Sequence, residues 1–221
     1  MCFSATASFV ASGALVASSV AIARIPKPKS AIPLSMFPAI FAILQFIEGL
    51  LWLNHRGFLA DNYKPVAVYA FLLIAFVLWP IFVPFSVYVL ESSRIRRVII
   101  LLCQFTGIYV GLANLVIIIR GPVYASVIGH SFAYTTNTTD ILFYLYLISV
   151  FISFLVSSNK RLVILGVALA ALCVTAIFIA STATFPSVWC FYAALLSLFL
   201  YLFFRYSANQ NRKMAVTNSS R

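Results

Sequence analysis

Glu48 is the residue whose position most suggests a chemical role, because it is the one acidic side chain placed well inside a long apolar run. A carboxylate at that depth is costly to take out of water, so its surroundings must neutralise it or hydrogen-bond it. Gln45, Gly49 and Trp52 recur with Glu48 at helical spacing and share its face. We expect that face to point into a helix bundle. Glu48 is then either a hydrogen-bonded structural carboxyl or, as we favour, a functional one.

Further reactive side chains are predicted to gather at the same depth once the apolar runs are threaded as helices. These are Cys2 and Ser4 near the N-terminus, Asn114, the loop residues His55 and His130, and the adjacent Trp189 and Cys190. Both histidines, two of the four cysteines and the intramembrane acid would then lie in the outer half of the membrane. The prediction is a polar pocket in the outer leaflet, with Glu48 at its centre.

Three interpretations of this outer cluster stay open. The first, which we favour, is a disulfide between Cys2 and Cys190, or plain packing, because the outer face of a membrane is oxidising. The second is a metal site built from Cys, His and Glu, although the sequence has no close-spaced ligand pair. The third is hydrolysis, with Cys2 or Ser4 as nucleophile and His130 or Glu48 as base. Removal of Met1 would add the free amine of Cys2.

The composition shows which elements must position these side chains. The chain has 221 residues, of which 63% are hydrophobic and 9% charged, and its mean hydropathy is +1.06. Too little polar surface remains to cover a soluble globule, so the chain is expected to be a membrane protein with short loops. The spanning elements must be helices, because open sheet edges are not tolerated in lipid.

The chain is strongly basic, since fifteen Lys and Arg against four Asp and Glu give a net charge of +11. The basic residues stand in small groups between apolar runs, which argues against nucleic acid as a partner.

Seven apolar runs qualify as membrane-spanning helices, so the fold class is predicted to be an all-α integral membrane bundle. The runs cover residues 6–23, 31–53, 65–90, 98–119, 141–157, 162–181 and 187–205. The run at 141–157 is short for the roughly 20 residues that a span requires. Residues 1–205 form one seven-helix domain, and residues 206–221 form a polar, basic tail. Four prolines lie inside two of the runs, where they predict kinks, and Gly107 and Gly111 predict close helix packing.

The loops predict the orientation of the chain in the membrane. Twelve basic residues fall on one side: Arg24, Lys27, Lys29, Arg94, Arg96, Arg97, Lys160, Arg161, Arg205, Arg212, Lys213 and Arg221. The other side carries Arg56, Lys64 and Arg120. Cytoplasmic loops are enriched in Lys and Arg, so the N-terminus is expected outside and the C-terminus inside, with anionic lipid head groups as partners of the basic side. The first run has no basic residue before it, so it is expected to be a retained helix rather than a cleaved signal.

Four segments of the chain resemble a bacterial family of unknown function. They are MCFSATASF at the N-terminus, LQFIEGLLW at 44–52, WPIFVPFSV at 79–87 and SVWCFYAALLS at 187–197. Members of that family begin Met-Cys-Phe/Trp-Ser-Ala-Thr and cross the membrane about seven times. Its pattern is matched here by Cys2, Ser4, Glu48, Gly49, Trp79, Pro80, Trp189 and Cys190. The resemblance implies that the protein lies in a prokaryotic cytoplasmic (inner) membrane. It implies no particular activity or cofactor.

These observations favour a non-enzymatic protein that binds or passes a small ligand or ion through the outer pocket. The ligand-binding residues would be Gln45, Glu48, Trp52, Asn114, Trp189 and Cys190, and no metal site is assigned. One alternative is a membrane-embedded hydrolase or thiol enzyme that uses Cys2 with His130 or Glu48. Another is a structural or assembly partner, in which the same residues are simply packed.

Overall fold

A computed structural model describes residues 4–181 and 183–219, with side chains up to residue 210. About 78% of the chain is helical. The α-helices are α1 (Ala5–Ala23), α2 (Ile32–Ser35), α3 (Phe37–His55), α4 (Lys64–Leu72), α5 (Trp79–Tyr88), α6 (Arg94–Arg120), α7 (Asp140–Val156), α8 (Lys160–Ile179), α9 (Phe185–Ser197) and α10 (Leu200–Ser219). Short 3-10 turns cover Lys29–Ala31 and Asp61–Tyr63, and a π-helical segment, η3 (Leu73–Leu78), joins α4 to α5.

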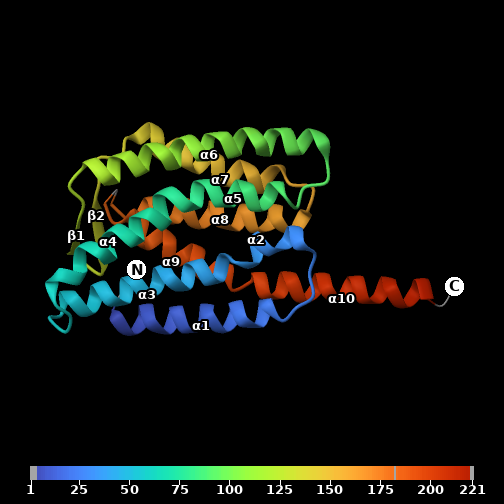
Figure 1. The fold of residues 1–221 in the computed structure, drawn as a ribbon, viewed down its shortest axis with the longest axis horizontal. Helices are drawn as coiled ribbons and strands as arrows, with labels where there is room; N and C mark the ends of the chain where they lie inside the picture. Colours follow the sequence, from blue (N-terminus) through green and yellow to red (C-terminus); the bar gives the residue numbers. More distant parts are fainter. Residues whose placement is uncertain (1–3, 182, 220–221) are drawn as a thin grey trace.

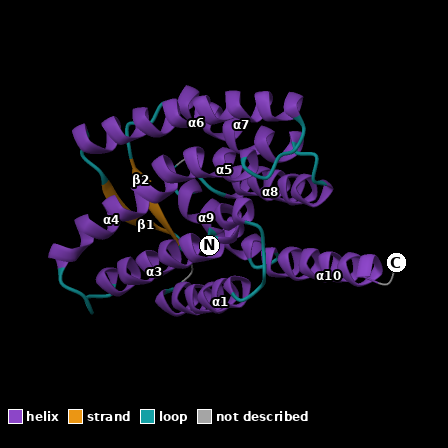
Figure 2. Ribbon diagram, turned by 45° about the vertical axis from the view of Figure 1, so that its right-hand side comes forward, coloured by secondary structure: helices purple, strands orange, loops and turns teal. Residues whose placement is uncertain are grey.

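The helices lie side by side along the long axis of the molecule (Figure 1). Helix α1 packs on α3, and α6 packs on both α5 and α7. Helix α9 lies between α3 and α8 and contacts both. The composition of α9 explains this central place, because most of its residues are small or apolar and can be buried against the neighbouring helices. Helix α10 extends beyond the end of the bundle (Figures 1 and 2).

The predicted multi-span helical bundle is confirmed in its main part. Six helical segments of the described chain are long and apolar enough to cross a membrane: Ala5–Ala23, Lys29–His55, Asp61–Tyr88, Arg94–Arg120, Lys160–Ile179 and Phe185–Gln210. The seventh predicted run is the apolar helix α7, whose 17 residues make it the shortest, as the sequence indicates. A seventh crossing and the orientation of the chain stay predictions.

Three of the apolar runs are each built from more than one helix. Proline explains two of the breaks, because Pro38 and Pro80 stand in the first turns of α3 and α5, where a missing N–H costs nothing. Of the four prolines predicted to produce kinks, Pro84 alone is inside a helix. The third break separates α9 from α10, and α10 runs on through Ser219, so the segment predicted as a polar tail is largely helical.

The structure adds one element that the sequence interpretation did not include, a β-hairpin in the long loop between α6 and α7. Strands β1 (Tyr124–Ile128) and β2 (Ser131–Thr135) pair antiparallel around a turn in which Gly129 has a φ of 60°. The hairpin covers one end of the bundle (Figure 2). There Phe132 packs on Trp52 with ring centroids 4.8 Å apart, and Tyr134 stacks on Phe71 at 4.4 Å. Strands of five residues are too short for their alternation to stand out from the sequence.

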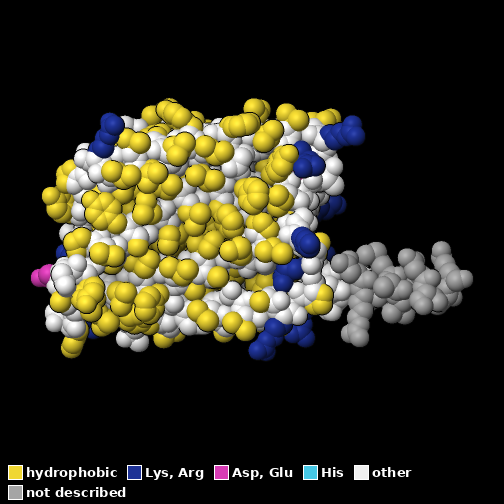
Figure 3. All heavy atoms as spheres, viewed as in Figure 1, with side chains coloured by type: hydrophobic (Ala, Val, Ile, Leu, Met, Phe, Trp, Pro, Cys, Tyr) yellow, Lys and Arg dark blue, Asp and Glu magenta, His cyan; other side chains and the backbone are white. Residues whose placement is uncertain are grey.

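Charged side chains lie at the two ends of the bundle, and hydrophobic side chains cover the visible face between them (Figure 3). We call one end the basic end. It holds the last residues of α1, α5 and α7 together with the first residues of α6 and α8, and α10 extends from it. The basic loop residues of the larger predicted group therefore lie together, while the hairpin lies at the opposite end. Exposed large hydrophobic side chains come from all the membrane-length helices and from α7, and we call this band the apolar girdle. An apolar band between two polar ends is what a bilayer requires of a protein that crosses it.

Candidate ligand site

The polar pair Gln45 and Glu48 lies in the interior of the bundle, as the helical spacing predicts. Both side chains are fully buried, and the Gln45 Nε2 lies 3.5 Å from a Glu48 carboxylate oxygen. On the same helix face, Gly49 allows the close approach of α1, because a Cβ at that position would lie 2.6 Å from the Phe9 ring. The pair is therefore enclosed by α1 on one side, and it is not exposed to lipid.

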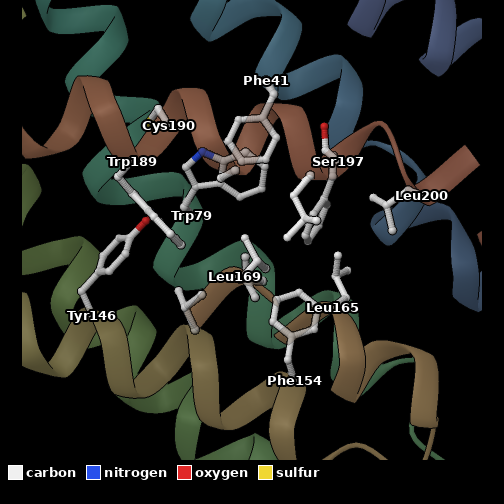
Figure 4. A pocket seen from close by; sticks show the side chains of 15 residues that line it. Phe41, Trp79, Tyr146, Phe154, Leu165, Leu169, Trp189, Cys190, Ser197 and Leu200 are labelled. Atoms are coloured by element: carbon white, nitrogen blue, oxygen red, sulfur yellow. The ribbon is translucent and has the colours of Figure 1, made fainter. Parts of the chain in front are cut away.

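Helix α9 carries the pair Trp189 and Cys190 into the middle of the bundle. The two side chains are 6% and 3% exposed. Helix α9 packs on α3, the helix that carries Gln45 and Glu48, and the Cys190 thiol interacts electrostatically with the Glu48 carboxyl. Tyr146 of α7 lies on the other side of Trp189 (Figure 4). Trp189, Cys190 and Tyr146 together separate two cavities.

The first cavity, which we call the aromatic cavity, encloses about 490 Å³ of unfilled space including its opening. Six aromatic residues from four helices line it: Phe37, Phe41, Trp79, Tyr146, Phe154 and Trp189. All of them except Phe37 are labelled in Figure 4. Leu165 and Leu169 of α8, Ser197 at the end of α9 and Leu200 at the start of α10 also line it. Small-molecule sites in proteins are lined mainly by apolar and aromatic side chains with a few polar groups, and this wall has that composition.

Trp79 is one of the residues with a polar group on the wall of the aromatic cavity. Its indole is 3% exposed and stacks on Phe41 with ring centroids 4.3 Å apart, so its position is fixed. Its Nε1 finds no hydrogen-bond acceptor among the described residues. In Figure 4 this nitrogen lies at the edge of the ring turned toward α9. A buried donor without an acceptor costs about 1–3 kcal/mol, which an acceptor on a bound molecule would recover.

The second cavity is lined in part by Asn114, shares Trp189 and Cys190 with the first, and encloses about 370 Å³ of unfilled space including its opening. The Asn114 Nδ2 donates to the backbone oxygen of Phe76 at 3.5 Å, and its Oδ1 accepts from the Thr138 hydroxyl at 3.1 Å. Phe76 belongs to the π-helical segment, where the extra residue in the turn alters the backbone hydrogen-bonding pattern. Asn114 thus ties α6 to this irregular turn and to the loop before α7.

The predicted outer cluster is therefore only partly assembled. Gln45 lies beside Glu48, which interacts electrostatically with Cys190. Asn114 instead lines the second cavity with Trp189 and Cys190, and Glu48 does not line that cavity. The sequence could place each residue at a depth along its helix. The rotation of each helix about its axis, which decides the neighbours, depends on packing with the others.

Trp52, His55 and His130 lie at the end covered by the hairpin. Trp52 is 5% exposed and packs between Phe132 and His55. His130 is exposed at the turn of the hairpin. Cys2 lies outside the described residues, so the hydrolytic arrangement of Cys2 with His130 or Glu48 stays a prediction.

Three of the four cysteines, and all the histidine and acidic residues that could bind a metal, lie in the described part of the chain. Cys103, Cys173 and Cys190 are buried, and none of these described cysteines pairs with another. Because Cys2 is outside the described residues, its proposed pairing with Cys190 stays a prediction. Within residues 4–181 and 183–219, no group of three or more His, Cys, Asp or Glu side chains is placed to hold a metal ion.

Sequence reasoning missed Glu91, which lies between α5 and α6 at the basic end. Its carboxylate accepts backbone N–H bonds from Ser92 at 3.0 Å, Ser93 at 2.9 Å and Ser158 at 2.7 Å, and hydroxyl bonds from Ser157 and Ser158. It therefore joins the α5–α6 loop to the α7–α8 loop. The available signal was a single acid followed by two serines and a basic cluster, but its partners on the second loop lie 66 and 67 residues away.

Two effects act on the Glu91 carboxyl. Burial raises its pKa, and the hydrogen bonds from Ser158, Ser93 and Ser157 lower it, so the net result is a pKa below the ordinary value of 4.5. Arg96 supports the same junction, because its Nη1 donates to the backbone oxygen of Ser157 at 2.9 Å. Glu91 is thus a structural carboxylate outside the apolar girdle.

Comparison with known proteins places the chain in a family. Residues 1–216 match the model of a family of unknown function, DUF6629. The chain belongs to this family. The resemblance predicted from the four sequence segments is confirmed to that extent, while the N-terminal motif of the relatives and the bacterial origin stay predictions. The chain matches no curated protein, and it matches no solved structure.

Proposed function

We propose that this protein binds a small, largely apolar ligand within the membrane, in the aromatic cavity. The observation that carries the proposal is the Trp79 Nε1, a buried donor without an acceptor among the described residues on the wall of that cavity. The ligand would carry one hydrogen-bond acceptor, such as a carbonyl, ether or hydroxyl oxygen. Its apolar body would lie against the rings of Phe41, Phe154 and Trp189.

The Gln45–Glu48 pair has a supporting part in this proposal. Cys190 is on the wall of the aromatic cavity and lies within electrostatic range of Glu48. A change of charge on Glu48 would therefore alter the field at the ligand without direct contact, since electrostatic interactions are weakly screened in a low-dielectric interior. This retains the predicted functional carboxyl and moves the ligand from the polar pair to the cavity beside it.

The setting of the site is part of the proposal. The protein would be a multi-pass protein of a bacterial cell membrane, with seven spans, the N-terminus outside and the basic end in the cytoplasm. Six helices of sufficient length and the apolar girdle support membrane insertion. The gathering of basic residues at one end supports the orientation.

The test compares two probes of matched shape, 4-bromoacetophenone and 1-bromo-4-ethylbenzene, which differ in the carbonyl oxygen. Binding to the detergent-solubilised protein is followed by quenching of tryptophan fluorescence, corrected for the partition of each probe into detergent. We expect the protein to prefer the ketone about fivefold, the equivalent of one hydrogen bond of about 1 kcal/mol. Trp79→Phe keeps the stacked ring and should abolish the preference.

Trp52→Phe is the matched control, because the Trp52 Nε1 also lacks an acceptor among the described residues but does not line the aromatic cavity. This variant should keep the fivefold preference. Equal affinity for both probes in the unmodified protein would contradict the proposal, and so would a preference that survives Trp79→Phe.

A further inference from the structure

A second site lies at the basic end, apart from the aromatic cavity. It is an open cleft between the connection that follows α1 and the first half of α10, with about 1740 Å³ of unfilled space including its mouth. Three cationic residues line it, Arg24 and Lys27 from the connection and Arg205 from α10. The α1–α2 connection and α10 lie side by side in both ribbon views (Figures 1 and 2).

Two of the three cations are held in place by their neighbours. The Lys27 ammonium donates to the backbone oxygens of Ile25 at 2.9 Å and Ala23 at 3.4 Å, which places it at the end of α1. The Arg205 Nη1 donates to the Tyr201 hydroxyl at 2.6 Å. A positioned side chain loses less conformational freedom on binding than a mobile one. Lys27 and Arg205 are therefore prepared for a ligand, and exposed Arg24 adds a third positive charge.

No carboxylate side chain balances these charges. The acidic residues of the whole chain are Glu48, Asp61, Glu91 and Asp140, and none of them lines the cleft. Three like charges around one cleft repel each other, and an anion placed between them removes that repulsion. Arginine and lysine together suit a phosphate, since guanidinium donates two parallel bonds and ammonium supplies a point charge.

We propose that this cleft binds a phosphate group, supplied by an anionic phospholipid or by free phosphate. This site goes beyond the proposed ligand site and does not depend on it. The place of the cleft favours the lipid source, because Arg24 directly follows the last residue of the apolar helix α1. A phosphate bound there would lie at head-group depth, and the apolar residues Ala21 and Ile25 also line the cleft.

The experiment measures the affinity of the detergent-purified protein for three probes by isothermal titration. These are dioctanoyl phosphatidylglycerol, dioctanoyl phosphatidylcholine and inorganic phosphate. We expect phosphatidylglycerol to bind at least about tenfold more tightly than phosphatidylcholine, whose choline would add a fourth cation beside the cleft. Inorganic phosphate binding as tightly as phosphatidylglycerol would identify free phosphate as the source. Weaker binding of inorganic phosphate would identify the lipid.

The variant R24Q/K27Q/R205Q should bind the preferred probe at least about tenfold more weakly. Its matched control is R94Q/R97Q/K160Q, which removes three exposed cations of the same end that do not line the cleft. Arg24→Gln alone serves as a milder variant if the triple substitution lowers thermal stability. An equal loss of affinity in both triple variants would overturn the proposal, because it would show a general effect of charge. A tight phosphate site that all three cleft substitutions leave unchanged would also overturn it.

Discussion

At the scale of single residues, Glu91 makes a prediction about pH. Its pKa is below the ordinary 4.5, so the folded state binds its proton less readily than the unfolded state. The carboxylate therefore stabilises the fold above about pH 4.5, and this contribution is lost as the pH falls through the lowered pKa. Thermal unfolding in detergent between pH 3 and pH 7 should show the loss.

Glu91→Gln should flatten that acid-side decline and lower stability at pH 7 by about 1–3 kcal/mol, because an amide group cannot accept all the N–H and O–H bonds that the carboxylate accepts. Asp140→Asn is the control, since Asp140 is an exposed carboxyl at the start of α7. That variant should keep the decline. An unchanged pH profile in Glu91→Gln would show that another group carries the effect.

Glu48 makes a second prediction at the residue scale. Glu48→Gln keeps the volume and a polar oxygen beside Gln45, so the fold should retain its thermal stability to within about 1 kcal/mol. Glu48→Leu removes the hydrogen bond inside the bundle and should cost about 1–3 kcal/mol. Circular dichroism during heating measures both variants. If Glu48→Gln unfolds as readily as Glu48→Leu, the negative charge itself stabilises the bundle and the carboxamide cannot replace it.

At the scale of helices, Gly107 sets how closely α6 approaches α5. A Cβ on Gly107 would overlap the backbone oxygen of Pro80, a group that a rotamer change cannot move aside. Gly107→Ala should therefore destabilise the protein by about 1–3 kcal/mol or more. Gly13→Ala is the matched helical control, because a Cβ there meets no atom within 4 Å. It should be neutral or stabilise by up to about 1 kcal/mol. Equal melting temperatures for the two variants would contradict the close approach.

The same scale shows what the sequence could predict. The run at 98–119 became Arg94–Arg120 and the run at 141–157 became Asp140–Val156, because hydrophobicity summed over about 20 residues identifies a membrane helix. The inward face of Glu48 followed from its helical spacing. The hairpin could not be predicted, because each strand has only five residues, too few for an alternating pattern to identify it. Asn114 could be given a depth but no neighbours, since helix rotation is set by packing between helices. Glu91 was missed because its second loop is distant in the chain.

At the scale of the whole molecule, the two proposed sites have different surroundings. The aromatic cavity lies among α3, α5, α7, α8 and α9, inside the apolar girdle, and suits an apolar ligand. The cationic cleft lies at the basic end, beside α10, and suits an anion. The last residue of the cavity wall, Leu200, is the first residue of α10, and the cleft begins at Tyr201. A phosphate that orders the first turns of α10 would therefore also fix one edge of the cavity.

The last prediction concerns the number of times that the chain crosses the membrane, which depends on whether α7 crosses it. Its 17 residues span about 25 Å, less than the roughly 30 Å hydrocarbon core, and a short helix can cross by thinning the bilayer around it. Seven crossings place the hairpin outside the cell and α10 inside.

In a Cys2→Ser background, the thiol introduced by Ser126→Cys, at an exposed position of the hairpin, should react with a membrane-impermeant maleimide on intact cells. Asn209→Cys should react only after the cells are opened. The other three thiols are buried, which keeps the background low. If both introduced thiols react on intact cells, α7 does not cross and the bundle has six spans.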